Sequence, residues 1–412
     1  MNESFTIQTA QQFINELAEE KITLNVCDIN QNSAPIKLMN VKIPAKLSAS
    51  PAIIEFGTLV AELAKGRFNL PVAIKLFRDS QDPHILGLKY EARVYQFIMK
   101  NILEPAVSPN FVSFVAYGCC FRDKRCFLMT EKVGSGVQFN KNKLFPVQTL
   151  YELYPTLKLR EKYQVLFQIV YSLEAMNRFK MAHNDLHSNN ILVMILDESV
   201  VLRYILDESG KTFTVKTRFI PYIFDWDVSI VEVVGINYKT NENFFDTVLD
   251  VNVFDPIRDL YTLFCYLGQV DSDITIVSTY AKNPTLLAKE AGEKISIDPT
   301  VRKKIERNFY FDRMVADKKI YKLSLAEFES YVGKNKAPKG ISVIYFTFEG
   351  QERIVLWNPY ICRLSSKSVN FPTPLKLLQN QFKMFETEKE IETPFVYHLP
   401  TDEEIESKII II

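Results

Sequence analysis

One polar run constrains this chain more than any other part of its sequence. Residues 181–193 read MAHNDLHSNNILV and place His183, Asp185 and Asn190 in the pattern H-x-D-x-x-x-x-N, ahead of an apolar, strand-like stretch. Further along, a second apolar stretch ends in the sequence FDWD at residues 224–227. The chain therefore carries a carboxylate and an amide in one loop, and another carboxylate at the end of a later predicted strand.

Three of these groups match the requirements of phosphoryl transfer. That reaction needs a carboxylate beside the attacking hydroxyl, and an amide and a second carboxylate to hold the metal ion that bridges the phosphates. We expect Asp185 to orient the hydroxyl and accept its proton, and Asn190 and Asp225 to bind magnesium. The groups occur in the expected order, so the sequence predicts an enzyme that transfers phosphate from ATP.

A lysine upstream of this loop is a candidate phosphate contact. Lys75 ends the sequence VAIK in a strand predicted at residues 70–77. An unpaired ammonium group in an apolar strand is costly, and Glu91, in the helix predicted next, is the natural counter-ion. We expect Lys75 to contact the nucleotide phosphates. The alternative is that Lys75 reaches solvent and Glu91 is a surface charge.

The loop itself needs support from other residues. We expect His183 to anchor the backbone, whereas His187 is open between a phosphate contact and simple packing. Asp259 opens an apolar helical pattern. Its carboxylate is expected to accept backbone N–H groups of the loop, with a plain helix N-cap or first-turn acid as the alternative.

The predicted elements indicate a small strand-rich part followed by a larger helical part. Apolar alternation predicts strands, and a period near 3.6 predicts helices. Gly134-Ser135-Gly136 predicts a linker between the parts. The expected elements are helices at residues 6–20, 88–103, 159–179 and over most of 268–331, strands at 21–27, 70–77, 111–117 and 126–130, two strands meeting at Gly57 within 53–60, and hairpins at about 195–220 and 341–357.

Composition narrows the class of protein. A chain of 412 residues that is 47% hydrophobic can bury a sizeable interior and is long enough for two or three units. Lys+Arg and Asp+Glu balance at 49 each, so total charge gives no sign of a nucleic-acid partner. None of the six cysteines forms a C-x-x-C pair, which favours free thiols over a disulfide or zinc framework.

The sequence also bears on location. Its first residues are polar and do not resemble a signal peptide. The most apolar run, residues 111–121, is too short to span a bilayer. We therefore expect a soluble intracellular protein without a membrane partner.

Together these residues resemble the eukaryotic-type protein kinase superfamily over roughly residues 46–330. The likeness to haspin-like atypical kinases comes from the H-x-D-L-H loop, the extra strands before Asp225 and the Asp-Leu-Tyr sequence at 259–261. The chain is also similar to divergent kinases of large DNA viruses, which implies the host cytoplasm or the virion as its location. The resemblance implies an α+β, two-lobed fold with ATP in the cleft. Its expected parts are an N-terminal extension (1–45), a β-rich N-lobe (46–133), a mainly helical C-lobe (134–330) and a C-terminal extension (331–412).

The resemblance also assigns nucleotide contacts. It implies that Thr130 is the gatekeeper, and that Glu131 and Val133 bind adenine through their backbone groups. Gly57 corresponds to the last glycine of the family's G-x-G-x-x-G loop. Ala52 and Ile54 fill the other two glycine positions, so phosphate has less room to approach the backbone there.

Three other departures from the family concern the metal motif and regulation. Trp226 and Asp227 replace the Phe and Gly of the usual metal motif, and no A-P-E sequence follows. Asn184 replaces the arginine that pairs with an activation-loop phosphate in many relatives. We therefore expect activity that does not depend on phosphorylation of that loop.

Three functions are compatible with these patterns. The first is a protein Ser/Thr kinase with a protein substrate, favoured by the VAIK strand and by the Asp259 helix. The second is a small-molecule phosphotransferase of the choline-kinase or aminoglycoside-kinase type, favoured by Asp227. The third is a catalytically weak pseudokinase scaffold, favoured by the loss of glycines. The sequence is silent on oligomeric state.

Overall fold

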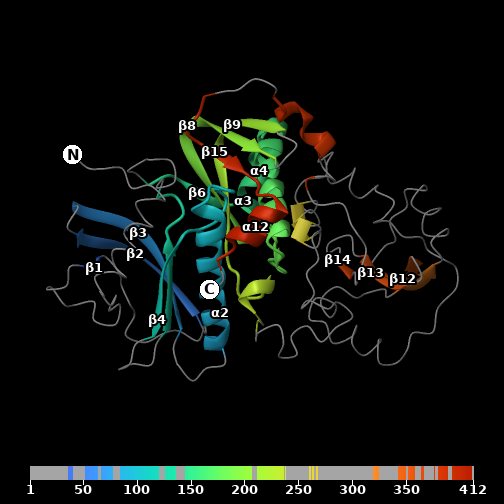
Figure 1. Cartoon of the computed structure of the whole chain (residues 1–412), viewed down its shortest axis with the longest axis horizontal. Coiled ribbons are helices and arrows are strands. Elements are labelled where there is room, and N and C mark those ends of the chain that lie inside the picture. The colour runs from blue at the N-terminus through green and yellow to red at the C-terminus, as the bar shows by residue number, and fades with distance from the viewer. Residues whose placement is uncertain are drawn as a thin grey trace. The chain divides into compact units, whose positions relative to one another are not determined.

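A computed structural model of the chain describes two compact units (Figure 1). The structure describes residues 36–39, 52–63, 66–77, 84–119, 126–135, 144–206, 211–235, 237, 259–260, 262–263, 266–267, 319–323, 342–348, 351–357, 363–365, 375, 379–387 and 392–410. Unit 1 comprises Met1–Gln148, Leu192–Asp227 and Phe385–Ile412, and unit 2 comprises Thr149–Ile191 and Val228–Met384. The first boundary thus falls after Gln148, whereas the sequence-based division places it after residue 133. Both units mix helices and strands, so the α+β class is confirmed.

A five-stranded antiparallel sheet in unit 1 carries the candidate lysine. Its order is β1-β2-β3-β5-β4, with β1 at Ile36–Met39, β2 at Ala52–Leu63, β3 at Gly66–Phe77, β4 at Phe114–Cys119 and β5 at Cys126–Glu131. Strands at 70–77, 111–117 and 126–130 were expected from the sequence, and the structure confirms them. β2 and β3 pair without interruption from Ala52 opposite Phe77 to Leu63 opposite Gly66.

The expected break at Gly57 is wrong. Gly57 lies inside β2, directly opposite Val72. β-branched and aromatic neighbours favour an extended backbone on both sides of this glycine, and pairing with β3 outweighs its weak strand propensity. Gly57 is therefore a strand residue and forms no turn. The connection between β1 and β2 lies outside the described residues.

One helix accompanies this sheet. α2 spans His84–Ile98 and continues into a π-helical turn, η2, at Met99–Leu103. Apolar residues recur along α2, and Val94, Phe97 and Ile98 are fully buried. The helix predicted at 88–103 is confirmed, except that its last turn is wider than an α-helix.

A second sheet in unit 1 is built around a long hairpin. β8 (Ile191–Ile205) lies between β15 (Val396–His398) and β6 (Val147–Thr149), and β9 (Thr212–Ile223) also pairs with β8. β8 and β9 are connected through a backbone bond from Leu206 N–H to Lys211 O. The hairpin expected near 195–220 is present, but its strands are longer and reach directly from the Asn190 loop to Phe224. A short helix, α12 (Asp402–Lys408), follows β15.

Unit 2 is centred on helix α4. Its other elements are α3 (Leu150–Leu153), η4 (Tyr154–Thr156), β7 (Met181–Ala182), η5 (Ser188–Asn190), β10 (Ile230–Val231), η6 (Glu232–Val234) and η7 (Gln379–Phe385, which reaches the unit boundary). α4 spans Leu159–Arg178, confirming the helix expected at 159–179. Most of it is buried, including Val165, Phe167 and Ile169.

A four-stranded sheet in unit 2 has the order β11-β12-β13-β14. Its strands are β11 (Lys319–Leu323), β12 (Ser342–Phe348), β13 (Gln351–Trp357) and β14 (Arg363–Ser365). The hairpin predicted at 341–357 is confirmed, because β12 and β13 pair antiparallel with Phe348 opposite Gln351. The helical prediction over 268–331 is wrong at 319–323, where the chain pairs in parallel with β12 and forms β11. The elements predicted at 6–20 and 21–27 lie outside the described residues.

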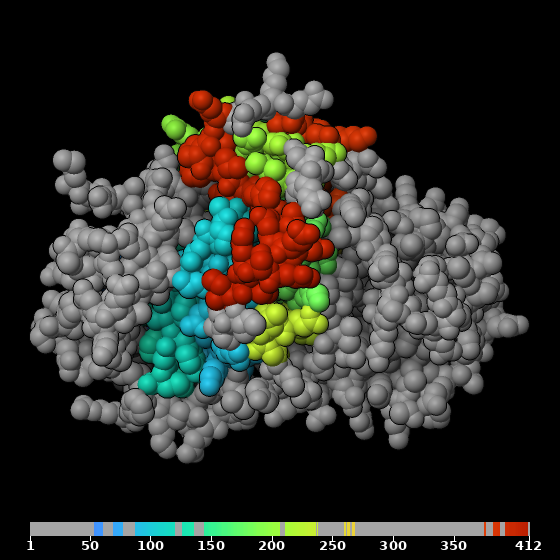
Figure 2. Space-filling view, in the orientation of Figure 1, coloured from blue at the N-terminus to red at the C-terminus, as the bar shows by residue number. Residues whose placement is uncertain are grey.

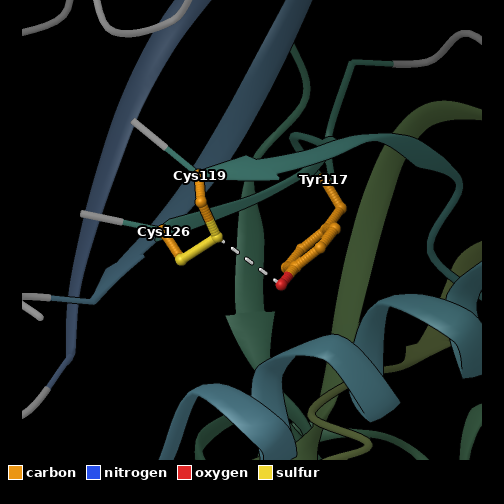
Figure 3. The surroundings of a disulfide bond; sticks show 3 residues. All are labelled: Tyr117, Cys119 and Cys126. Carbon is orange, nitrogen blue, oxygen red and sulfur yellow. Dashed lines mark hydrogen bonds between the residues drawn. A yellow bond between two sulfur atoms is a disulfide. The ribbon is translucent and has the colours of Figure 1, made fainter. Parts of the chain in front are cut away.

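A disulfide joins β4 and β5 (Figure 3). Cys119 and Cys126 stand opposite each other in the antiparallel pair, with 4.0 Å between their Cα atoms. The Tyr117 hydroxyl donates a hydrogen bond to Cys119 Sγ at 3.7 Å. The expectation that all cysteines are free thiols is wrong for this pair, because strand register, and not sequence spacing, brings the sulfurs together. Among the described helices, none combines the length and the apolar composition needed to cross a membrane.

Candidate active site

Lys75 joins two carboxylates within unit 1. Its Nζ lies 2.9 Å from Glu91 Oε2 and 3.2 Å from Glu91 Oε1. The same nitrogen lies 2.9 Å from Asp225 Oδ1. The predicted ion pair with Glu91 is therefore confirmed, and the alternative in which both charges point to solvent is wrong. Lys75 comes from β3, Glu91 from α2, and Asp225 from the chain just after β9.

The backbone of Asp225 is held in an uncommon conformation. Its φ is 68°, in the left-handed region that Asp and Asn adopt more readily than other non-glycine residues. Asp225 N–H donates to Tyr95 Oη at 3.1 Å. The following residue, Trp226, is fully buried, with its ring centroid 6.0 Å from that of Phe111. The tyrosine bond and the buried indole together fix where the carboxylate points.

Burial and charge pull the ionisation of this cluster in opposite directions. Burial lowers the pKa of Lys75, but Glu91, Asp225 and Asp227 raise it, and the result lies above its usual range. Burial raises the pKa of Glu91 to about 7, with Lys75 opposing the shift and the two aspartates adding to it. Burial also raises the pKa of Tyr95, so this residue stays a neutral hydroxyl. Lys75 is therefore always charged, whereas Glu91 titrates near neutrality.

The sheet face that carries Lys75 is partly open. Directly paired residues share a face, so Ile54 stands beside Lys75, and Phe56, Ala73 and Thr130 form the next row. Ile54 is 57% exposed and Phe56 is 52% exposed, which is unusual for large apolar side chains. Lys132 Nζ lies 4.8 Å from the centroid of the Phe56 ring. An accessible apolar surface thus adjoins the partly buried Lys75.

The proposed adenine contacts follow β5. The N–H of Glu131 donates to Ser113 O at 2.9 Å, and its carboxylate accepts from Ser113 Oγ at 2.9 Å. The backbone N–H and the carboxylate of Glu131 are thus both bonded to Ser113, which directly precedes β4. Val133 lies in the turn after β5 and is partly exposed. Its contact with adenine stays a prediction, as does any nucleotide contact of Gly57.

Asp259 anchors the polar loop in unit 2. Its Oδ2 accepts from His183 N–H and its Oδ1 from Asn184 N–H, at 2.6 and 2.8 Å. Asp259 and His183 are both buried. The predicted role of Asp259 is confirmed: one carboxylate satisfies two consecutive amides, which fixes the turn where Asn184 has a φ of 67°. The side chain of Asn184 donates to Val228 O at 3.0 Å.

The other loop residues are also bonded to one another. Asn190 Nδ2 donates to Asp185 O at 2.9 Å, which orients the amide. His187 Nδ1 accepts from Asn189 N–H at 3.2 Å, so a neutral imidazole carries its proton on Nε2, which lies 3.7 Å from Asp185 Oδ2. The ring of His187 lies 5.3 Å from that of Tyr266. The structure thus gives His187 a packing contact and a carboxylate neighbour.

The structure groups the predicted residues into two sets. Lys75, Glu91 and Asp225 meet in unit 1, and Asp185, Asn190 and Asp259 belong to one loop assembly in unit 2. Sequence reasoning missed Tyr95 and Tyr266. Tyr95 follows Glu91 by one helical turn, so helix periodicity was the available signal. Tyr266 is helical and lies seven residues after Asp259.

The donor atoms in both sets suit magnesium. Asn190 Oδ1 accepts no hydrogen bond in the described part of the chain, and the Asp225 carboxylate is partly exposed. Mg²⁺ prefers oxygen ligands and is often held by one or two protein groups together with substrate phosphates. Within the described ranges, no three His, Cys, Asp or Glu side chains cluster as metal ligands.

Comparison with known proteins adds no assignment. No protein-family model matches the chain, and no curated protein matches it either.

Proposed function

We propose that this chain is an ATP-dependent, magnesium-using protein Ser/Thr kinase with a divergent, two-lobed, haspin-like kinase fold. One observation carries the proposal: Lys75 Nζ contacts both Glu91, which lies 16 residues later in the sequence, and Asp225, which lies 150 residues later. A partly buried lysine held by a helix carboxylate and by a potential metal-binding carboxylate is the arrangement that positions nucleotide phosphates.

The chain's own groups then have distinct tasks. Lys75 neutralises phosphate charge, and Glu91 keeps the amine in place. Asp185 orients the acceptor hydroxyl and takes its proton. Asn190 and Asp225 would hold magnesium, which when bound spreads the negative charge that develops on the phosphates. Transfer requires all of these groups to act on the same nucleotide.

The open apolar face of the first sheet is suited to a nucleotide base. Ile54, Phe56 and Ala73 present apolar surface next to Lys75. A planar base that covers this surface removes apolar area from water, at roughly 25 cal/mol per Å². This surface therefore supports ATP as the phosphate donor.

A small-molecule kinase is the second candidate. Asp227 lies near enough to raise the pKa of Lys75, so the site holds one more carboxylate than the metal requires. A surplus acid can bind an amine or a hydroxyl of a small acceptor. Acceptor choice separates the two candidates.

The test is phosphate transfer from labelled ATP with magnesium to two acceptor sets. One set contains unstructured proteins rich in Ser and Thr, and the other contains choline, ethanolamine and aminoglycosides. Asp185→Ala should lower turnover by about 10²- to 10⁴-fold. Asn189→Ala, in the same loop, is the matched control and should stay within a few-fold of the original protein.

The outcomes are distinct. Labelled protein supports the kinase proposal, and a labelled small molecule supports the second candidate. Equal labelling by Asp185→Ala and the unaltered protein contradicts both. Magnesium-dependent ATP binding without transfer to any acceptor would point to a pseudokinase.

A further inference from the structure

A segment at residues 395–410, here called the strap, pairs with the hairpin that leads to Asp225. β15 runs parallel to β8, with Val396 opposite Arg203 and His398 opposite Ile205. Phe395 O accepts from Arg203 N–H, and Leu399 N–H donates to Ile205 O, at 2.9 and 3.0 Å. β8 and β9 form one hairpin, and β9 ends two residues before Asp225.

The strap then reaches the end of helix α2. His398 N–H donates to Ala106 O at 3.1 Å, just past η2. α12 follows, with a capping box between Thr401 and Glu404. Figure 2 shows the red atoms of this part of the chain next to the cyan atoms of α2 and η2.

The strongest contact joins Asn101 to the backbone of Ile410. Asn101 Oδ1 accepts from Ile410 N–H at 2.8 Å, and its Nδ2 donates to Ile410 O at 3.1 Å. Nδ2 also donates to Phe97 O, one turn earlier in the helix. Asn101 is 5% exposed, so losing these partners would leave a buried amide unsatisfied. Asn101 therefore binds the strap through main-chain groups, independently of the Ile410 side chain.

Asn101 sits in an unusual turn. η2 is π-helical, with Glu104 N–H bonded to Met99 O. The wider turn inserts one residue into the helical repeat and changes the direction of the side chains that follow. This turn is what directs the Asn101 amide to the strap.

We propose that the strap positions Glu91 and Asp225 around Lys75 by holding the two elements that carry them. This inference rests on the proposed function, because it concerns the same charged cluster. α2 is a rigid rod, and Glu91 lies about 15 Å along it from Asn101 at 1.5 Å per residue. The β8–β9 hairpin delivers Asp225. The strap pairs with β8 at Arg203–Ile205, near the closed end of the hairpin, and bonds to η2 through Asn101. It thus ties the hairpin that leads to Asp225 to the helix that carries Glu91, and Asn101 is a positioning residue.

Ile410→Pro tests the strap with little collateral change. Proline at position 410 lacks the backbone N–H that donates to Asn101 Oδ1, but it keeps the carbonyl that accepts from Asn101 Nδ2. Ile409 already has φ −59° and ψ 126°, which a following proline accepts. Ile410→Ala is the control, because it removes the side chain and keeps both backbone groups.

The first readout is hydrogen exchange of the full chain at the amides of residues 91–98 in α2. Loss of one hydrogen bond, about 0.5–1.5 kcal/mol, corresponds to roughly 2- to 10-fold faster exchange in Ile410→Pro than in Ile410→Ala. Equal exchange in the two variants overturns the inference. This readout needs no enzymatic activity, so it decides on the strap even if the chain transfers no phosphate.

The second readout is turnover. Ile410→Pro should lower kcat by about 2- to 10-fold, with the KM for the acceptor unchanged. If the strap acts through Glu91, the same change has no further effect in a Glu91→Gln background. If Ile410→Pro lowers kcat by the same factor in the Glu91→Gln background as in the unaltered protein, the inference is overturned. Absence of transfer by the unaltered protein would count against the proposed function alone.

Discussion

Lys75 and Glu91 show how a single pair of charges depends on its surroundings. Glu91 has almost no exposed surface, and Lys75 is its direct counter-ion. Burial raises the pKa of Glu91 to about 7, so near neutral pH the charged form of this residue depends on the lysine. Removing either charge alone is therefore expected to cost more than removing both.

Lys75→Met should destabilise the fold in a pH-dependent way. Without Lys75, the folded-state pKa of Glu91 rises further above its unfolded value. The folded state then holds the Glu91 proton more tightly, so its stability is retained at pH 5 and falls as pH rises through the unfolded and then the folded pKa. We expect a loss of about 3–5 kcal/mol in the free energy of unfolding at pH 8 and a smaller loss at pH 5.

Chemical denaturation at both pH values measures this effect. The Lys75→Met/Glu91→Gln double variant is the control, because it has no buried carboxylate at position 91 and should lose the pH dependence. A Lys75→Met variant whose destabilisation is the same at pH 5 and pH 8 would contradict the assignment.

The Phe56 side chain is expected to contribute to ATP binding but little to the free energy of unfolding. Its ring is half exposed, so Phe56→Ala should change the free energy of unfolding by no more than about 0.5 kcal/mol. ATP affinity should fall about 5-fold or more, since a stacking contact with a base contributes about 1–3 kcal/mol. Leu144→Ala, at another exposed apolar residue of unit 1, is the control and should change neither quantity. Calorimetric titration with ATP and magnesium gives both affinities.

At the scale of elements, the polar loop in unit 2 depends on a distant helical segment. The loop leaves β7, turns through Asn184 in the left-handed region and closes in η5. Its two consecutive amides at the turn are satisfied by Asp259. The loop is therefore shaped by an element that comes much later in the sequence.

Asp259→Asn should disturb this loop without removing a group that touches substrate. An amide offers one acceptor oxygen in place of two, so one loop N–H loses its partner. We expect the free energy of unfolding to fall by about 1–3 kcal/mol and kcat to fall while the KM for ATP changes little. Steady-state kinetics and thermal unfolding test this. Leu263→Val, at another buried helical residue near Asp259, serves as the packing control, and a kcat loss as large in that variant would contradict a specific role for Asp259.

At the scale of the whole molecule, later parts of the chain hold the turn at Asn184. Asn184 has a φ of 67° and bonds to two later residues. Its side chain donates to Val228 O, and its backbone N–H to Asp259. The turn is thus held by bonds that need no phosphate.

Turnover should be the same before and after phosphatase treatment. We expect rates within about 2-fold, because no described loop contact requires an added phosphate group. Mass spectrometry must confirm that the treatment removed any phosphate present. A large loss of activity after complete dephosphorylation would contradict this prediction.

From the sequence alone, two interacting pairs could be predicted, because one member of each pair needs a particular kind of partner. A lysine in an apolar strand needs a carboxylate, which identified Glu91, and backbone amides in a tight polar loop need an acceptor, which identified Asp259. Periodicity also located α2, α4 and most strands of the first sheet, because those segments bury one face. Local sequence patterns were sufficient to predict a feature when its physical requirement lay within a short segment, or when the sequence offered a single residue that could meet that requirement.

Tertiary structure decided what depends on register and on distant contacts. Pairing with β3 carried β2 straight through Gly57, and the register of β4 and β5 brought Cys119 to Cys126. Long-range contacts likewise assigned Tyr95 to the Asp225 backbone and Asn101 to Ile410. Such contacts are not encoded in any short window of sequence, because a backbone N–H or carbonyl is the same in every residue and only the packed fold selects its partner.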